Sequence, residues 1–165
     1  MSKTDASPGS LENSAAIREQ LTLLMTARLQ QKSTRCEIIP AELLQGAALS
    51  LIEARPIPAA DRIHFLAESA PILRQVLSSL PAHPSVFLNT GLALPGGIEA
   101  ARLDEALTRL EAADPMLAGM AEARCYGGLL PEEQPALSDL TPAELERRWR
   151  IARAWLQDAI SSEQA

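Results

Sequence analysis

The stretch TPAELERRWRIARAWL, from Thr141 to Leu156, contains both tryptophans of the chain and decides how the sequence is expected to fold. It opens with the signature of a helix start: a capping hydroxyl, a proline in the first turn, and Glu144, which can bond back to the cap. At about 100° per residue, the apolar residues fall on one face. These are Leu145, Trp149, Ala152, Leu156 and Ala159. The stretch is therefore predicted to be an amphipathic helix with Trp149 in the core.

Four arginines lie in the same stretch: Arg147, Arg148, Arg150 and Arg153. All except Arg148 share the face opposite Trp149, and Arg148 lies at the edge of the apolar face beside Trp155. Glu146 precedes Arg150 by four residues, the spacing at which ion pairs form along a helix. Two interpretations stay open at this point. The arginines form either a solvated charged face or a surface that binds nucleic acid or another protein.

The composition of the whole chain favours helices and excludes several classes of protein. Of the 165 residues, 47% are apolar, mostly alanine and leucine, which are strong helix formers. No apolar run of about 18 residues exists, so no membrane span is expected. The formal net charge of −6 argues against tight nonspecific binding of nucleic acid by the chain as a whole. The two cysteines match no metal-ligand spacing and suit a reducing cytoplasm.

Apolar residues recur at helical spacing along most of the chain, and convincing strand patterns are absent. The predicted helices cover 15–31, 40–53, 61–80 and 98–112. Asp114 and Pro115 predict the start of a further helix, and Gly127 with Gly128 predicts its end. Pro71 is expected to kink or split the third helix. We predict an all-α protein with two small helical domains and a flexible linker. The divisions are a disordered tail at 1–13, a first domain at 14–80, the linker at 81–100 and a second domain at 101–162.

The second domain has the layout of a helix-turn-helix. A short helix is predicted at 131–137, followed by a turn at 138–140 and the capped helix. From Leu103 to Leu156 the sequence closely resembles the C-terminal domain of extracytoplasmic-function (ECF) sigma factors. It is most similar to the subgroup in which this domain ends in a W-R-x-A-R-A-W-L helix.

The N-terminal half resembles the other domain of the same family. The segment IIPAELLQGAALSLI looks like the family's docking segment for the polymerase clamp helices, with Glu42 and Gln45 at the matching positions. The segment DRIHFLAESAPILRQVL resembles the helix that helps to melt the promoter. Its matching residues are Arg62, His64, Phe65, Ala67 and Arg74.

The resemblance implies a bacterial, cytoplasmic transcription protein that is not an enzyme and needs no cofactor or metal. Its partners would be core RNA polymerase, promoter DNA and an anti-sigma factor. The resemblance places polymerase binding at Glu42, Gln45 and Leu49, and promoter melting at His64 and Phe65. Weak DNA binding would use Thr141, Arg147, Arg148, Arg150 and Arg153.

The sequence departs from the family in the segments that are expected to contact DNA. From Gln75 to Ala101 it contains no lysine or arginine, so this segment cannot neutralise a phosphate. Pro135 stands where the family usually has alanine, and Asp139 replaces the glycine of the turn. Glu144 and Glu146 stand where threonine and lysine are common, and both would repel phosphate. These departures favour an alternative function, a degenerate sigma paralogue that contacts polymerase or an anti-sigma factor without reading promoters.

Overall fold

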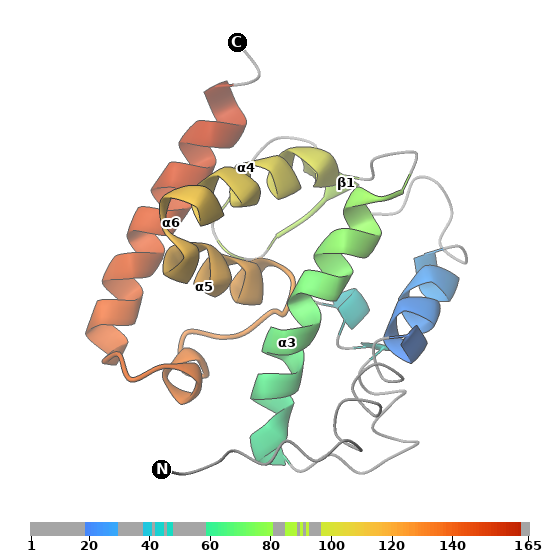
Figure 1. Ribbon diagram of the computed structural model, residues 1–165, viewed down its shortest axis with the longest axis horizontal. Coiled ribbons are helices and arrows are strands. Elements are labelled where there is room, and N and C mark those ends of the chain that lie inside the picture. The colour runs from blue at the N-terminus through green and yellow to red at the C-terminus, as the bar shows by residue number, and fades with distance from the viewer. Residues whose placement is uncertain are drawn as a thin grey trace, which may run out of the picture.

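A computed structural model describes the chain at residues 19–29, 38–40, 42–44, 46–47, 59–80, 85–88, 90, 92 and 97–162. The named elements are α3 (Ala59–Ser78), β1 (Ser85–Val86), β2 (Ile98–Glu99), α4 (Ala100–Ala113), α5 (Pro115–Cys125), the 3₁₀ helix η1 (Gln134–Leu137) and α6 (Pro142–Ser162). Residues 19–29 and the described residues at 40–47 are also helical. The predicted all-α class is confirmed, because helices dominate the described residues (Figure 1).

The helix boundaries follow the local signals in the sequence. Asp114 caps α5, and its carboxylate accepts hydrogen bonds of 3.1 Å from the backbone N–H groups of Met116 and Leu117. The helix ends at Cys125, and Gly128 then adopts a positive φ of 68°, which glycine tolerates without strain. The predicted start and stop of this helix are therefore confirmed.

One of two predicted helix features is wrong, and the other is only narrowed. The sequence predicts that Pro71 kinks or splits its helix; α3 is not split and runs from Ala59 to Ser78, so the kink stays a prediction. The proline lies on the exposed side of the helix, where a carbonyl that loses its N–H partner can bond to water. Ile98 does not begin a helix, because it pairs in an antiparallel ladder with Val86.

The described part of the predicted linker is paired and partly buried. β1 and β2 form a two-stranded antiparallel sheet, and Ile38 bridges to Val86 on the other side. Val86 and Ile98 are 0% and 3% exposed, so this short sheet belongs to the core. The sequence analysis did not expect these strands, since a ladder of two residues is too short to produce a periodic pattern.

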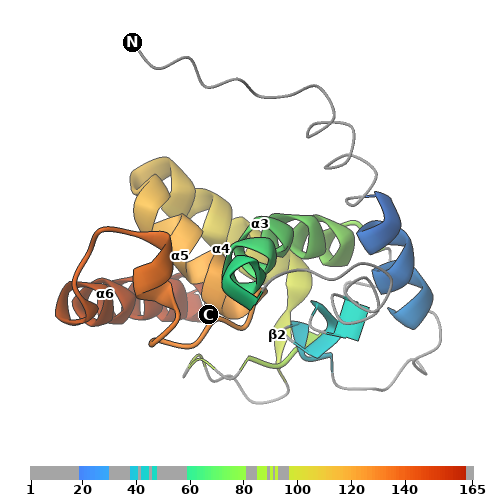
Figure 2. The ribbon, with the colours of Figure 1, turned by 90° about the horizontal axis from the view of Figure 1, so that it is seen from below.

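α3 lies between the helical residues 19–29 on one side and α4, α5 and α6 on the other (Figures 1 and 2). It packs directly on α4 and α5. Buried side chains from both predicted domains, from Leu21 and Met25 to Leu156 and Ile160, form one continuous hydrophobic core. The sequence predicts two separate helical clusters, and the structure instead shows them in contact. The proposed domain boundaries themselves stay a prediction.

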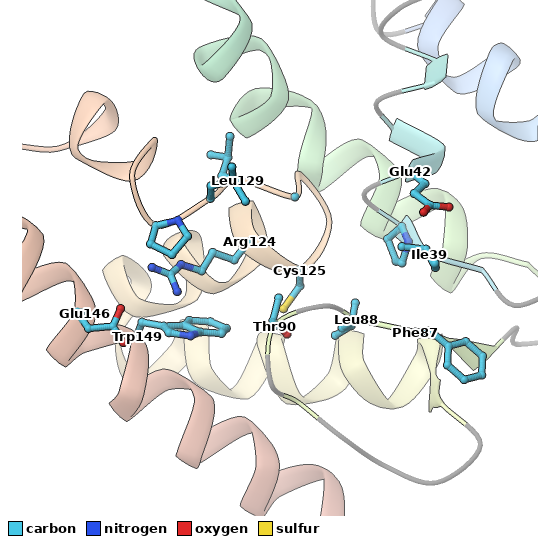
Figure 3. Close-up of a pocket in the computed structure, with 14 residues that line it drawn as sticks. Ile39, Glu42, Phe87, Leu88, Thr90, Arg124, Cys125, Leu129, Glu146 and Trp149 are labelled. Atoms are coloured by element: carbon cyan, nitrogen blue, oxygen red, sulfur yellow. The ribbon is translucent and has the colours of Figure 1, made fainter.

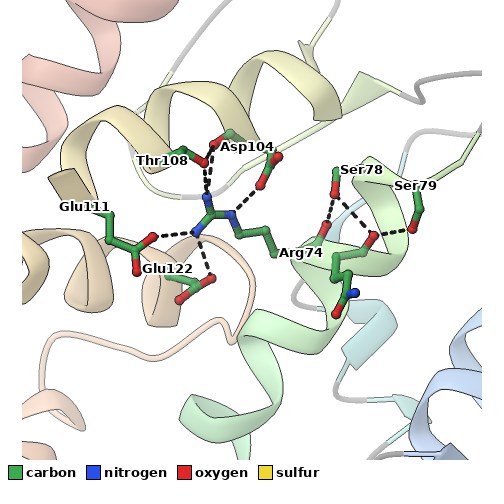
Figure 4. A network of polar contacts seen from close by, with 8 residues as sticks. Arg74, Ser78, Ser79, Asp104, Thr108, Glu111 and Glu122 are labelled. Atoms are coloured by element: carbon green, nitrogen blue, oxygen red, sulfur yellow. Dashed lines mark hydrogen bonds and ion pairs between the residues drawn. The ribbon is translucent and has the colours of Figure 1, made fainter.

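Arg74 of α3 makes polar contacts with both α4 and α5 (Figure 4). Its Nε donates to Asp104 Oδ1 at 2.6 Å, and its Nη1 lies 3.2 Å from Glu122 Oε1. Nη2 donates to the Asp104 backbone oxygen at 3.0 Å and to the Thr108 hydroxyl at 2.7 Å. Burial raises the pKa of the Glu122 carboxyl, although Arg74 acts in the opposite direction. One guanidinium thus connects α3 to both α4 and α5.

Candidate nucleic-acid and polymerase interfaces

The start of α6 is a complete capping box. The Thr141 backbone N–H donates to Glu144 Oε2 at 2.9 Å, and the Glu144 N–H donates back to the Thr141 hydroxyl oxygen at 3.3 Å. The Thr141 hydroxyl also donates to Glu144 Oε2 at 2.8 Å. The hydrogen bond from the Thr141 backbone lowers the pKa of the Glu144 carboxyl. The predicted helix start is confirmed, and both of its polar side chains are engaged in the cap.

The buried face of α6 is the one predicted from the helical spacing. Leu145, Trp149, Ala152, Leu156 and Ala159 are all buried, and Trp149 is 4% exposed. The guanidinium of Arg124, from α5, lies over the Trp149 ring at 4.6 Å from its centroid. Such a cation–π contact is strengthened when water is excluded. Trp149 therefore fixes α6 against α5 as well as filling the core.

Three of the four arginines of α6 face the solvent. Arg147, Arg150 and Arg153 are exposed. Arg148 is half-buried, and its Nη1 lies 3.2 Å from the Met116 Sδ atom of α5. The structure thus brings three of the predicted DNA-binding arginines to one surface and draws the fourth toward the body of the protein.

The helix predicted at residues 131–137 is much shorter than expected. Residues 131–133 form turns, and η1 covers only Gln134–Leu137 as a 3₁₀ helix. Pro135 lies inside this element and has no backbone N–H to continue an α-helical ladder. The prediction of a helix over 131–137 is therefore wrong in length. The first helix of the expected helix-turn-helix is reduced to a single tight turn.

The predicted polymerase-binding residues are only partly described. Glu42 is exposed on a helical stretch. Gln45 and Leu49 lie outside the described residues. Polymerase binding at these three positions stays a prediction.

The promoter-melting candidates differ in exposure. His64 is exposed on α3, whereas Phe65 is half-buried and packs against the core. Arg74, a further match to the melting helix, is engaged with α4 and α5. His64 is therefore accessible from solvent, and Phe65 only in part.

Arg124 is a buried charged residue that the sequence analysis did not single out. It is 6% exposed, yet it lies in a stretch of sequence that carries no binding motif. No sequence pattern links Arg124 to Trp149, which follows 25 positions later. Only the packing of α5 on α6 brings the two side chains together.

Other chemistry finds little support in the described part of the chain. No group of three or more His, Cys, Asp or Glu side chains there could hold a metal ion. Burial raises the pKa of the Cys125 thiol to about 12, so it is neutral and a poor nucleophile near pH 7. None of the helices within these residues is long and apolar enough to cross a bilayer.

A comparison with protein-family models matches residues 93–162 to the ECF sigma factor family. This segment contains α4, α5, η1 and α6. The match covers less than half of the 165-residue chain and shows a likeness to this family over the C-terminal part of the chain. Comparisons with curated proteins and with solved structures found no match.

ECF sigma factors are transcription regulators without enzymatic activity, and DNA binding through a helix-turn-helix is typical of them. The match does not extend to residues 1–92, so the resemblance of the N-terminal half to the polymerase-docking domain stays a prediction.

Proposed function

We propose that this protein binds core RNA polymerase in the bacterial cytoplasm and directs it to promoter DNA. The exposed arginine surface of α6, formed by Arg147, Arg150 and Arg153, is the observation that supports the proposal most directly. It belongs to the second helix of the helix-turn-helix layout, the element that enters a major groove in proteins of this class. Thr141 and Arg148 complete the proposed DNA contact.

The DNA contact is expected to be weak. Three exposed arginines can neutralise few phosphates, and the exposed carboxylates of Glu144 and Glu146 lie on the same helix. Affinity that rests on phosphate contacts falls steeply with salt, by a slope of about 0.9 per contact in a plot of log affinity against log salt. Stable promoter complexes would therefore require polymerase. In this proposal polymerase is held through Glu42, Gln45 and Leu49, and DNA melting involves His64 and Phe65.

Replacing Arg147 and Arg150 together with alanine is expected to weaken DNA binding about 10–100-fold at low salt and to lower the salt slope by about 2. The measurement is a fluorescence-anisotropy titration of a labelled duplex at several salt concentrations. Both side chains are exposed, so the melting temperature should not change.

The matched substitution in the opposite direction is Glu146→Lys, which should strengthen DNA binding. Glu146 is preferred to Glu144 for this test because the Glu144 carboxylate caps α6 and its loss would disturb the helix start. If neither variant changes the affinity or its salt dependence, α6 is not the DNA-binding element.

A second function is favoured by two specific observations. η1 retains only four residues of the first helix of the motif, and Arg74 is bound to Asp104 and Glu122. Both features suit a degenerate paralogue that contacts polymerase or an anti-sigma factor and does not read promoters. Such a protein would bind core polymerase or an anti-sigma factor, and the Arg147 and Arg150 substitutions would have no effect on its activity.

A further inference from the structure

A cavity of about 620 Å³ lies where the N-terminal half of the chain meets α5 and α6. Figure 3 shows Arg124 and Trp149 near one end and Ile39, Glu42 and Phe87 near the other. The volume falls in the range of about 300–1,000 Å³ that is typical of sites for small organic ligands. The cavity therefore has the size of a ligand site and touches both predicted interaction surfaces, through Glu42 and through α6.

Arg124 supplies a buried positive charge at one end of this cavity. Its Nε donates to Gln134 Oε1 at 2.8 Å, and its guanidinium stacks on Trp149. The two terminal nitrogens make no hydrogen bond to any described residue, and no carboxylate in the described part of the chain forms an ion pair with Arg124. Burial lowers the pKa of the Arg124 guanidinium, and the nearby carboxylates of Glu146 and Glu132 offset only part of this effect. The terminal nitrogens, which have no hydrogen-bond partner among the described residues, therefore still favour an anion at this end of the cavity.

The remaining wall is mostly apolar. Leu88, Leu129 and Ile39 line it, together with the ring of Trp149. Cys125 adds a neutral thiol. The Thr90 hydroxyl oxygen is buried beside this thiol without a hydrogen bond of normal geometry to another described atom, and it offers one further polar contact. A ligand that fits must therefore combine one anionic group with an apolar body.

The carboxylates near the cavity limit the charge of such a ligand. Glu42 and Glu146 both line it, and both are exposed to solvent. Each would repel a phosphate that carries close to two negative charges, whereas a single negative charge held at the buried Arg124 is less affected because water screens the glutamates. This balance disfavours a dianionic phosphate and favours a monoanion.

We propose that this cavity binds an organic monocarboxylate with an apolar body, with the carboxylate on the terminal nitrogens of Arg124. Arginine pairs with a carboxylate through two parallel hydrogen bonds, and the planar guanidinium is already oriented by Trp149 and Gln134. The apolar body extends between Trp149 and Leu88 toward Ile39. The cavity borders the surfaces proposed for polymerase and DNA, at Glu42 and at α6, but the proposed ligand contacts do not depend on either of those functions.

The test titrates the full chain with decanoate and, as a matched neutral probe, with 1-decanol. The Trp155→Phe variant leaves Trp149 as the single tryptophan, so its fluorescence reports directly from the cavity wall. Decanoate should bind with a dissociation constant on the order of 0.1–1 mM. Binding should change the Trp149 fluorescence, and decanol should bind at least tenfold more weakly.

Three further variants separate the charge effect from simple apolar binding. Arg124→Gln should weaken decanoate binding about tenfold or more, and Arg124→Lys should recover part of it because the charge remains. Glu146→Gln alters only an exposed side chain and should strengthen decanoate binding severalfold without affecting decanol. The proposal is overturned if decanoate does not bind at millimolar concentration, if decanol binds equally well, or if folded Arg124→Gln and Glu146→Gln proteins both bind decanoate as the native chain does.

Discussion

Replacing Trp149 with alanine is expected to lower the free energy of unfolding by about 3–5 kcal/mol, the range for truncation of a buried aromatic side chain. Trp149 is 4% exposed and fills the space between α6 and α5. Its loss also uncovers the guanidinium of Arg124, which stacks on the ring in the native protein. The measurement is urea denaturation of the full chain, followed by far-ultraviolet circular dichroism.

Trp155 provides the control for this prediction, since it lies on the same helix and is only half-buried. Arg109 lies 6.0 Å from the centroid of its ring. Trp155→Ala should cost less than half as much as Trp149→Ala, because fewer of its contacts are lost from the core. Equal costs for the two substitutions would contradict the placement of α6.

Arg74→Ala is expected to cost about 2–4 kcal/mol and to loosen the contact between α3 and the helices α4 and α5. Removing one partner of a fully buried ion pair costs roughly 3–5 kcal/mol. We expect a smaller loss of stability for Arg74→Ala because the Asp104 side chain is 35% exposed and water screens part of the interaction. The substitution leaves Asp104, Glu111 and Glu122 close together with no cation between them. Urea denaturation measures the cost, and small-angle X-ray scattering measures any expansion.

Glu122→Gln is the matched control for Arg74→Ala. Burial raises the pKa of the Glu122 carboxyl in the folded protein, so its ionised form is less favourable there than in the unfolded chain. The folded state therefore gains stability from this group as the pH falls through the raised pKa, and loses it as the pH rises. Glu122→Gln should cost little near pH 7 and should remove this part of the pH dependence. If Arg74→Ala is as stable as the native chain, Arg74 does not hold the two halves together.

Features that depend on neighbouring residues were predictable from the sequence. The capping box of α6 and the Asp114 cap of α5 arise within four residues of chain, and both are confirmed. The buried face of α6 follows from helical spacing alone. The exposure of Arg147, Arg150 and Arg153 follows from the same spacing, because a helix with one buried face turns the opposite face to water.

Features that depend on distant residues were not predictable. Arg74 meets Asp104 and Glu122 across 30 and 48 positions, and no pattern in a single sequence links them. The contact of Arg124 with Trp149 also joins residues that are far apart in the sequence, so no local pattern predicts it. The prediction of a helix over 131–137 gave too little weight to Pro135, whose missing N–H leaves only the tight turn of η1.

The most direct test of the proposed function is in-vitro transcription with core RNA polymerase and the full chain on a library of promoter fragments. We predict transcripts with defined start sites that appear only when the chain is added. Glu42→Arg should abolish them by weakening binding to core polymerase, and the Arg147 and Arg150 double alanine variant should reduce them although it still binds polymerase. A native chain that binds core polymerase tightly but yields no transcripts above those of the core enzyme alone would contradict promoter reading and would support the degenerate paralogue.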